Sequence, residues 1–313
     1  MHTLAKPGES RNTLPPTTVR GRFAPSPTGP LHFGSLVAAV GSYLSARAQG
    51  GEWLVRMEDL DPPREVKGAA DDILRTLEAY GFEWQGAVMY QSRRRDAYEA
   101  ALENLRHRGA LYPCGCTRKE IADSSITGIE GPVYPGTCRG GLAAGRSARA
   151  LRVRTDNAVI EFEDRVQGRQ HVPIEREIGD FVARRADGFY AYQLAVVVDD
   201  AEQGITEIVR GADLLTSTAC QVYLQQLLGL QTPGYLHLPA AVNNRGEKLS
   251  KQTFAKPLPR AKPVAVLRQT LDFLGQDPLL DAGESSLASF WAAAVAAWDE
   301  KRIPRIRTRR CND

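Results

Sequence analysis

The sequence predicts an α/β fold with a parallel sheet that is interrupted by an insertion. First, a short strand at residues 19–24, a helix with one apolar face at residues 34–49 and a buried strand at residues 53–57 form a strand–helix–strand unit. Second, the composition changes at residues 111–149, which are rich in glycine and cysteine and lack periodicity. Third, the apolar run 194–198 predicts a strand that returns to the same sheet.

Further elements are expected in order along the chain. Residues 150–183 alternate like short antiparallel strands, and the Asp187-Gly188 turn precedes the strand at residues 194–198. A glycine follows directly after each of the helices expected at 66–80 and 93–108 and marks its end. The expected helices are 66–80, 93–108, 213–228, 263–274 and 285–298, and one more strand is expected at 235–242.

Length and composition are those of a globular protein. The chain has 313 residues, 42% of them hydrophobic, and a net charge of +3, which is too small to identify a nucleic-acid binder. The polar residues 1–19 have no apolar core of a signal peptide, and no segment approaches the roughly 18 apolar residues of a membrane span. We therefore expect a cytoplasmic protein with no membrane partner.

The loop after the first strand is a candidate phosphate site. Residues 25–35 bring glycines and His32 to the start of a helix, where free N–H groups and the helix dipole favour an anion. The spacing of Gly29 and Gly34 copies the phosphate loop of ATPases, but Ser35 stands where that motif has lysine. Taken alone, the segment is explained equally well as a proline-stiffened turn with a helix cap.

A second segment, Lys-Leu-Ser-Lys-Gln at residues 248–252, places two lysines in a glycine-containing loop. Alone it is usually a solvated basic turn. Together with His-Phe-Gly-Ser at residues 32–35, it resembles the paired signatures of class I aminoacyl-tRNA synthetases. The segments 22–29, 56–61 and 210–213 resemble the glutamate-specific branch of that class, and the resemblance covers residues 20–254.

Residues 192–200 and the short C-terminus resemble a truncated group within this branch that lacks an anticodon-binding domain. The resemblance implies activation of L-glutamate by ATP to glutamyl-adenylate without tRNA. Glutamate would then pass to the queuosine base in the anticodon loop of tRNA(Asp). The implied organisation is a flexible tail (1–19), two halves of a Rossmann-like catalytic domain (20–110 and 191–252), a zinc-bearing, acceptor-like insertion (111–190) and a short helical C-terminal region (253–313).

A glutamate pocket needs cations for two carboxylates and an anion for the ammonium group. By the resemblance, Arg22 and Arg210 hold carboxylates, Glu58 holds the ammonium group and Tyr192 adds a hydrogen bond. The resemblance also assigns the pocket wall to Phe23, Ala24, Pro25 and Ser26. The alternative for each charged residue is an exposed ion pair without function, and for Tyr192 it is an ordinary place in the core.

The implied reaction is attack of a glutamate carboxylate on the α-phosphate of ATP, with release of pyrophosphate. No protein nucleophile is needed, because alignment of the reactants and stabilisation of phosphate charge suffice. By the resemblance, the catalytic residues are His32, Gly34, Lys248 and Lys251. ATP would be bound with magnesium by His32, Gly34, Ser35 and Lys251.

Three of the five cysteines cluster in the insertion. Cys114, Cys116 and Cys138 offer three thiolates for one structural zinc ion per chain, and such clusters favour metal over disulfides in a reducing compartment. The resemblance names Tyr134 as the fourth ligand. Water, His107 and His171 are alternatives.

Three other functions compete with this interpretation. A conventional glutamyl-tRNA synthetase that charges a tRNA 3′ end would use the same residues, and the short segment 253–313 argues against it. A small-molecule adenylyltransferase would need no RNA. A zinc-stabilised RNA-binding module would have lost activity, whereas the intact signatures favour an enzyme. The arginine-rich residues 301–310 predict either phosphate contacts or a solvated, mobile terminus.

Overall fold

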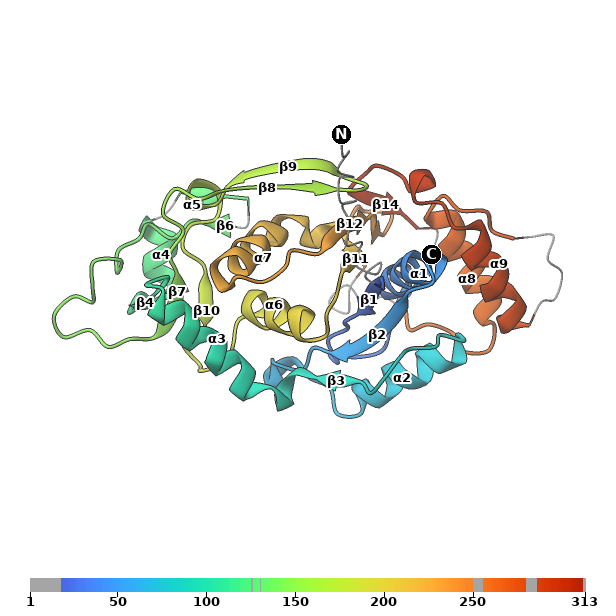
Figure 1. Cartoon of the computed structure of the whole chain (residues 1–313), viewed down its shortest axis with the longest axis horizontal. Helices are drawn as coiled ribbons and strands as arrows, with labels where there is room; N and C mark the ends of the chain where they lie inside the picture. The colour runs from blue at the N-terminus through green and yellow to red at the C-terminus, as the bar shows by residue number, and fades with distance from the viewer. Residues whose placement is uncertain (1–17, 125, 130, 250–255, 280–285, 312–313) are drawn as a thin grey trace, which may run out of the picture.

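The protein is described by a computed structural model that covers residues 18–124, 126–129, 131–249, 256–279 and 286–311. Figure 1 shows strands β1, β2, β11 and β12 in the middle of the molecule beside helix α1. Helices α8 and α9 lie at one end, and strands β4, β7 and β10 of the inserted segment lie at the other. In the described part of the chain, no helix is long and apolar enough to cross a membrane.

The strand–helix–strand unit expected at the start of the chain is confirmed. β1 (Arg20–Phe23), α1 (Phe33–Ala48) and β2 (Glu52–Met57) follow one another, and β1 pairs with β2 in parallel. β3 (Met89–Tyr90) extends this sheet beyond β2. The next helical segments are η1 (Pro62–Arg64), α2 (Ala69–Ala79), η2 (Gln91–Arg93) and α3 (Arg95–His107).

The second half of the sheet begins with a strand that the sequence analysis did not predict. β11 (Glu207–Gly211) lies next to β1, where the backbone N–H of Thr206 donates to the carbonyl of Arg20 at 3.0 Å. β12 (Gly234–Leu238) pairs in parallel with β11, and β8 (Val159–Asp164) joins β12 on its other side. β9 (Gly168–Pro173) completes the order β11-β12-β8-β9. The hairpin β8–β9 from the inserted segment therefore extends the central sheet.

The strand predicted at residues 194–198 is wrong, because α6 (Tyr192–Glu202) occupies this segment. Residues 194–197 are all buried, within an apolar cluster that includes residues of α3 and α7 (Leu215–Leu228). A helix enclosed in this way has no polar stripe, and a short apolar run does not distinguish it from a buried strand. The helix predicted at 213–228 is confirmed by α7 and the preceding turn η3 (Ala212–Leu214).

The inserted segment contains the antiparallel strands that its alternation predicted. β4 (Leu111–Cys114), β7 (Ala150–Val153) and β10 (Val182–Arg184) form an antiparallel sheet in the order β10-β7-β4. The connections carry the short elements α4 (Arg118–Ser124), β5 (Thr127–Gly128), β6 (Gly131–Pro132) and α5 (Ile174–Glu177).

The C-terminal region packs on the sheet domain as two helices and a strand. α8 (Pro263–Phe273) and α9 (Leu287–Ala297) confirm the predicted helices, and η6 (Glu300–Arg302) follows. Trp291 of α9 contacts the rings of Tyr43 and Phe82, with centroids 4.7 and 4.9 Å away. β14 (Thr308–Arg310) pairs with β13 (Ala240–Val242), so the described end of the basic tail is a strand instead of a mobile terminus.

Candidate active site

A cavity of about 670 Å³ lies where β1, β2 and β11 end, which is the edge at which open α/β sheets bind ligands. The residues assigned from the sequence converge on it from five separate stretches of the chain. Its lining includes Arg22, Phe23, Ala24, Pro25, Ser26, His32, Gly34, Ser35, Glu58, Tyr192, Arg210 and Lys248. Lys251 lies outside the described residues. The cavity is large enough for a ligand of nucleotide size.

Two arginines under the cavity share one carboxylate. Nε and Nη2 of Arg22 donate to the two carboxylate oxygens of Asp200 at 3.1 and 3.3 Å, and Nη2 of Arg56 lies 2.8 Å from Oδ1. All three side chains are buried. Burial acts to raise the pKa of Asp200, but the charges of Arg22 and Arg56 outweigh it and hold this pKa below its usual value. Asp200 is therefore an anion that joins α6 to β1 and β2.

Glu58 faces the same cavity with little compensation for its charge. Its nearest cation is Arg56, whose Nη2 lies 3.4 Å from Oε1, and Arg56 already binds Asp200. Burial raises the pKa of Glu58 above its usual value, although Arg56 and Arg22 oppose the shift. A second cation at this carboxylate would therefore be stabilising, and a substrate ammonium group supplies one.

Arg210 is a buried cation held by neutral groups. Its Nε donates to Nε2 of His237 at 3.1 Å and its Nη1 to the Tyr192 hydroxyl at 3.3 Å. Its Nη2 donates to Thr218 Oγ1 and Gln221 Oε1, both at 2.8 Å. Among the residues that the structure describes, no carboxylate forms an ion pair with Arg210. Because a buried charge without a counter-ion is costly, this guanidinium is suited to an anionic ligand.

The two signature segments meet at the start of α1. Nδ1 of His32 accepts from the backbone N–H of Ser35 at 3.3 Å and caps the helix. A Cβ on Gly34 would lie 3.2 Å from the ring of His32 and 3.5 Å from the carbonyl oxygen of Leu249, so glycine permits this close approach. Lys248, beside Leu249, forms an ion pair with Asp213 at the cavity. The helix N-terminus and a lysine thus face one space, as phosphate binding requires.

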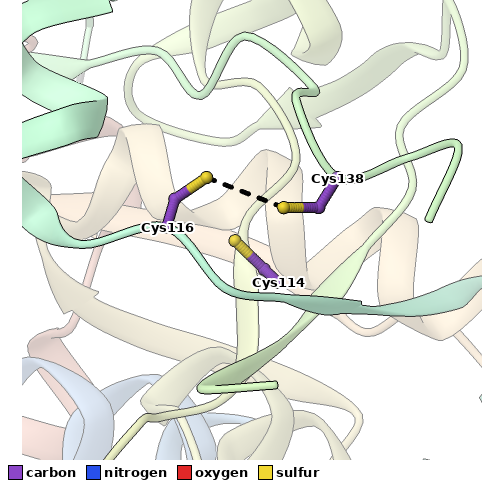
Figure 2. A group of neighbouring side chains, drawn as sticks. All are labelled: Cys114, Cys116 and Cys138. Atoms are coloured by element: carbon purple, nitrogen blue, oxygen red, sulfur yellow. Dashed lines mark hydrogen bonds between the residues drawn. The ribbon is translucent and has the colours of Figure 1, made fainter. Parts of the chain in front are cut away.

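The three clustered cysteines are also brought together (Figure 2). The sulfur atoms of Cys114, Cys116 and Cys138 lie within 4.8 Å of one another, and this group could hold a metal ion. The Tyr134 hydroxyl lies 3.4 Å from the sulfur of Cys114 and 3.7 Å from that of Cys116. It also accepts the backbone N–H of Cys138 at 2.9 Å. Four sulfur and oxygen donors therefore converge, a set that fits a tetrahedral metal.

The two histidines that the sequence left open as ligands are engaged elsewhere. His107 is exposed at the end of α3 and pairs with Glu103, with Nε2 and Oε1 3.0 Å apart. His171 is exposed on β9 and pairs with Glu161, with Nδ1 and Oε1 2.8 Å apart. Neither belongs to the group of close metal-binding side chains.

Sequence reasoning assigned no role to several buried groups beside the cavity: Arg56, Asp164, Asp200 and His237. Arg56 carried a usable signal, because a charge inside the apolar strand 53–57 implies a buried partner. Asp200 and Asp164 carried none, since each contacts residues far away in the sequence.

Known proteins resemble this chain along most of its length. Residues 18–257 match the family described as tRNA synthetases class I (E and Q), catalytic domain. The chain is 60% identical over 285 residues to the glutamyl-Q tRNA(Asp) synthetase of Chromobacterium violaceum, covering 91% of this chain and 95% of that one. It is 60% identical over 288 residues to the protein of the same name from Dechloromonas aromatica, covering 91% and 96%.

A solved structure agrees with these relatives. The glutamate–tRNA synthetase from Elizabethkingia anophelis superposes with a TM-score of 0.77 at 25% identity, covering 95% of this chain and 68% of that chain. The fold, the cavity at the sheet edge and the paired signature segments therefore agree with the names of these proteins, which are glutamyl-Q tRNA(Asp) synthetase and glutamate–tRNA synthetase. The chain belongs to the class I tRNA synthetases for glutamate and glutamine, and within them to the family of glutamyl-Q tRNA(Asp) synthetases.

Proposed function

We propose that the protein activates L-glutamate with ATP in the absence of tRNA and then transfers glutamate to the queuosine base of tRNA(Asp). The family relationship supports the overall reaction. The observation that supports the choice of substrate is the buried guanidinium of Arg210, whose hydrogen-bond partners among the described residues are all neutral and which faces the same cavity as Glu58. A ligand with a carboxylate and an ammonium group satisfies both residues.

In the proposed complex, Arg210 and Tyr192 bind one carboxylate of glutamate and Glu58 binds the ammonium group. Arg22 contributes to the second carboxylate with a charge that it shares with Asp200. Phe23, Ala24, Pro25 and Ser26 form the adjoining wall. Each charge-assisted hydrogen bond contributes about 1.5 to 3 kcal/mol.

ATP is proposed to lie against the N-terminus of α1. His32, Gly34 and Ser35 present the helix N-terminus to the phosphates, and Lys248 lines the same cavity. The role of Lys251 rests on the sequence motif. Magnesium bound with ATP would neutralise phosphate charge. A carboxylate oxygen of glutamate attacks the α-phosphorus, the bond to the β-phosphate oxygen breaks, and pyrophosphate leaves.

We propose one structural zinc ion on Cys114, Cys116, Cys138 and Tyr134. Burial, with the neighbouring thiols, raises the pKa of Tyr134, so the phenol would need the charge of a bound cation to become a phenolate ligand. The site lies in the inserted segment, and the proposed adenylation uses none of its residues. Its contribution is to the fold of that segment.

ATP–pyrophosphate exchange without tRNA tests the proposal. We expect exchange that depends on glutamate, and in Arg210→Ala a loss of glutamate-dependent exchange of about 100-fold, because a buried charge-assisted contact is removed. Arg169→Ala is the control, since this arginine is exposed and pairs with Glu161 on the β8–β9 hairpin. Exchange that ignores glutamate, or that other amino acids support equally, would refute glutamate activation.

A further inference from the structure

We propose that Asp164 and His237 are positioning residues that hold Arg210 and keep its charge available to the substrate carboxylate. The inference rests on the glutamate site proposed above. The three residues come from neighbouring strands: Asp164 from β8, His237 from β12 and Arg210 from β11. His237 stands opposite Arg210 in the parallel register, so the chain of contacts crosses the sheet from strand to strand.

The hydrogen bonds fix the proton on His237. Nε of Arg210 lies 3.1 Å from Nε2 of His237, and a guanidinium N–H can only donate, so Nε2 accepts. The single proton of the neutral ring is therefore on Nδ1, which donates to Oδ2 of Asp164 at 2.6 Å. Burial and the charge of Arg210 together lower the pKa of His237 to about 4, although Asp164 opposes the shift. A second ring proton would point at the N–H of Arg210.

Asp164 is itself held in place. Its Oδ1 accepts from the backbone N–H groups of Val166, Gln167 and His237 at 3.1, 2.8 and 3.2 Å. The side chains of Asp164 and His237 are both 0% exposed. Because Asp164 and His237 are fixed, they also fix the position of the Arg210 guanidinium. Supporting residues commonly orient a functional side chain in this way.

The imidazole ring separates the two charges. A carboxylate in direct contact with Arg210 would neutralise it and compete with the substrate, as Asp200 does in part for Arg22. With His237 between them, Asp164 stabilises the guanidinium from a distance. Thr218 and Gln221 of α7 hold Nη2, and the hydroxyl of Thr218 also lies 3.2 Å from Nε2 of His237. Nη1, whose described partner is the Tyr192 hydroxyl, is left with an N–H for a ligand in the cavity.

The sharpest test is Asp164→Asn. Three backbone N–H groups surround Oδ1, so the amide oxygen is expected there and the amide NH₂ then faces Nδ1 of His237. The ring must then carry its proton on Nε2, against the N–H of Arg210. We expect KM for glutamate in ATP–pyrophosphate exchange to rise about 10- to 100-fold, the effect of losing one hydrogen bond to a buried charge. KM for ATP should stay within about twofold of the wild-type value.

His237→Gln is the conservative rescue. Its amide has one acceptor for Arg210 and donors for Asp164, so KM for glutamate is expected to stay within about threefold of wild type. His237→Phe keeps a ring without either group and should behave like Asp164→Asn. Asp180→Asn is the matched control, because Asp180 is equally buried and accepts from Tyr112, Arg139 and Thr155 away from the cavity.

The outcomes separate the two proposals. If the wild-type protein shows no glutamate-dependent exchange, the proposed function fails. If it does, and Asp164→Asn keeps the wild-type KM for glutamate, the positioning role fails. It also fails if KM for ATP rises to the same extent, or if Asp180→Asn raises KM for glutamate equally, since either result indicates general damage. Direct glutamate binding by calorimetry, with circular dichroism of each folded variant, checks the same point without turnover.

Discussion

Three buried arginines at the site differ in how their charge is compensated. Arg22 and Arg56 share the carboxylate of Asp200, whereas Arg210 contacts His237 and three neutral side chains. An arginine that is already paired with a carboxylate contributes mainly to the shape of the site. An arginine without a counter-ion attracts an anionic ligand. In the proposed complex, Arg210 therefore attracts its substrate carboxylate more strongly than Arg22 attracts the other one, because the charge of Arg22 is shared with Asp200.

The neutral ring of His237 has a consequence for stability. Its pKa in the folded protein is about 4, whereas an unfolded histidine titrates near 6.5. Between these values the unfolded chain binds a proton that the native protein does not. The contribution of His237 to the free energy of unfolding is therefore complete above about pH 6.5. It falls by roughly 2 kcal/mol by pH 5, and by more as the pH approaches 4.

Urea unfolding at pH 7.5 and pH 5.0 measures this effect in wild type and in His237→Gln. We expect the fall in free energy of unfolding to be about 2 kcal/mol smaller in the variant, which has no ring to protonate. The pKa of Glu58 is raised in both proteins by groups other than His237, so its contribution cancels in the comparison. His237 helps to hold the pKa of Asp164 below its usual value, and the stability linked to that shift is lost only at a pH below the range compared. An identical fall in both proteins would contradict the prediction.

The residues that the sequence placed at the site lie in recognisable segments, whereas Asp164 and His237 lie outside them. Arg22, Glu58 and Arg210 belong to recognisable segments, and the structure brings them to one cavity. Asp164 and His237 act through partners that lie 73 and 27 positions away in the chain. Local patterning contains no information about such contacts, since the order of the strands in the sheet creates them.

At the scale of elements, the misassigned helix α6 shows why secondary structure matters to the site. Tyr192 at its start lines the cavity, and Asp200 eight positions later binds Arg22. A helix separates these positions by about 12 Å, whereas a strand would separate them by about 27 Å. Only the helix allows Tyr192 to line the cavity while Asp200 binds Arg22, which lines the same cavity. The sequence run alone did not decide between the two, because every apolar side chain in it is buried or partly buried.

The cysteine cluster connects elements of the inserted segment. Cys114 lies in β4, Cys116 and Cys138 lie in loops, and their sulfur atoms are close together. We expect the purified protein to contain about one zinc ion per chain, and Cys138→Ser to lose most of it. The variant should unfold more readily in the inserted segment while it keeps affinity for glutamate, since the cavity lining includes none of the cluster. Metal analysis, limited proteolysis and glutamate calorimetry measure the three effects.

Cys311→Ser is the matched control, because Cys311 is buried beside Val242 and outside the metal-binding group. It should retain zinc. A wild-type protein that folds fully without metal, or a Cys138→Ser variant with undiminished zinc, would show that the cluster is a set of ordinary reduced thiols.

At the scale of the whole molecule, one hairpin of the inserted segment belongs to the same sheet as active-site residues. β8 pairs with β12, and the hairpin β8–β9 lies beside the central strands (Figure 1). Asp164 of this hairpin thereby reaches His237, which contacts Arg210. The C-terminal helices join the same core through Trp291 and the rings of Tyr43 and Phe82. The sequence predicted most of these elements but not their pairing across the molecule, because strand order and long-range aromatic contacts leave no local pattern.

The acceptor RNA is tested at this scale, because it concerns how the complete molecule meets a tRNA. We expect glutamate to pass from the adenylate to queuosine in tRNA(Asp). A hydroxyl of the modified base attacks the activated carbonyl, the acyl–phosphate bond breaks, and AMP leaves. Bases in an anticodon loop are unstacked and open to an enzyme in a way that helical bases are not. The relatives that bear this activity in their name are aligned over 95% and 96% of their length.

The assay compares transfer of radiolabelled glutamate to three substrates: tRNA(Asp) with queuosine, tRNA(Asp) without it, and queuosine-bearing tRNA(Asp) whose 3′-terminal adenosine has been removed. We expect labelling of the first and third at similar rates and of the second at background, because the acceptor is the modified base and not the terminal ribose. Arg210→Ala, weakened in adenylate formation, should label the first and third less in equal proportion. Loss of labelling on 3′ trimming, or equal labelling without queuosine, would instead assign the protein to conventional charging of a tRNA 3′ end.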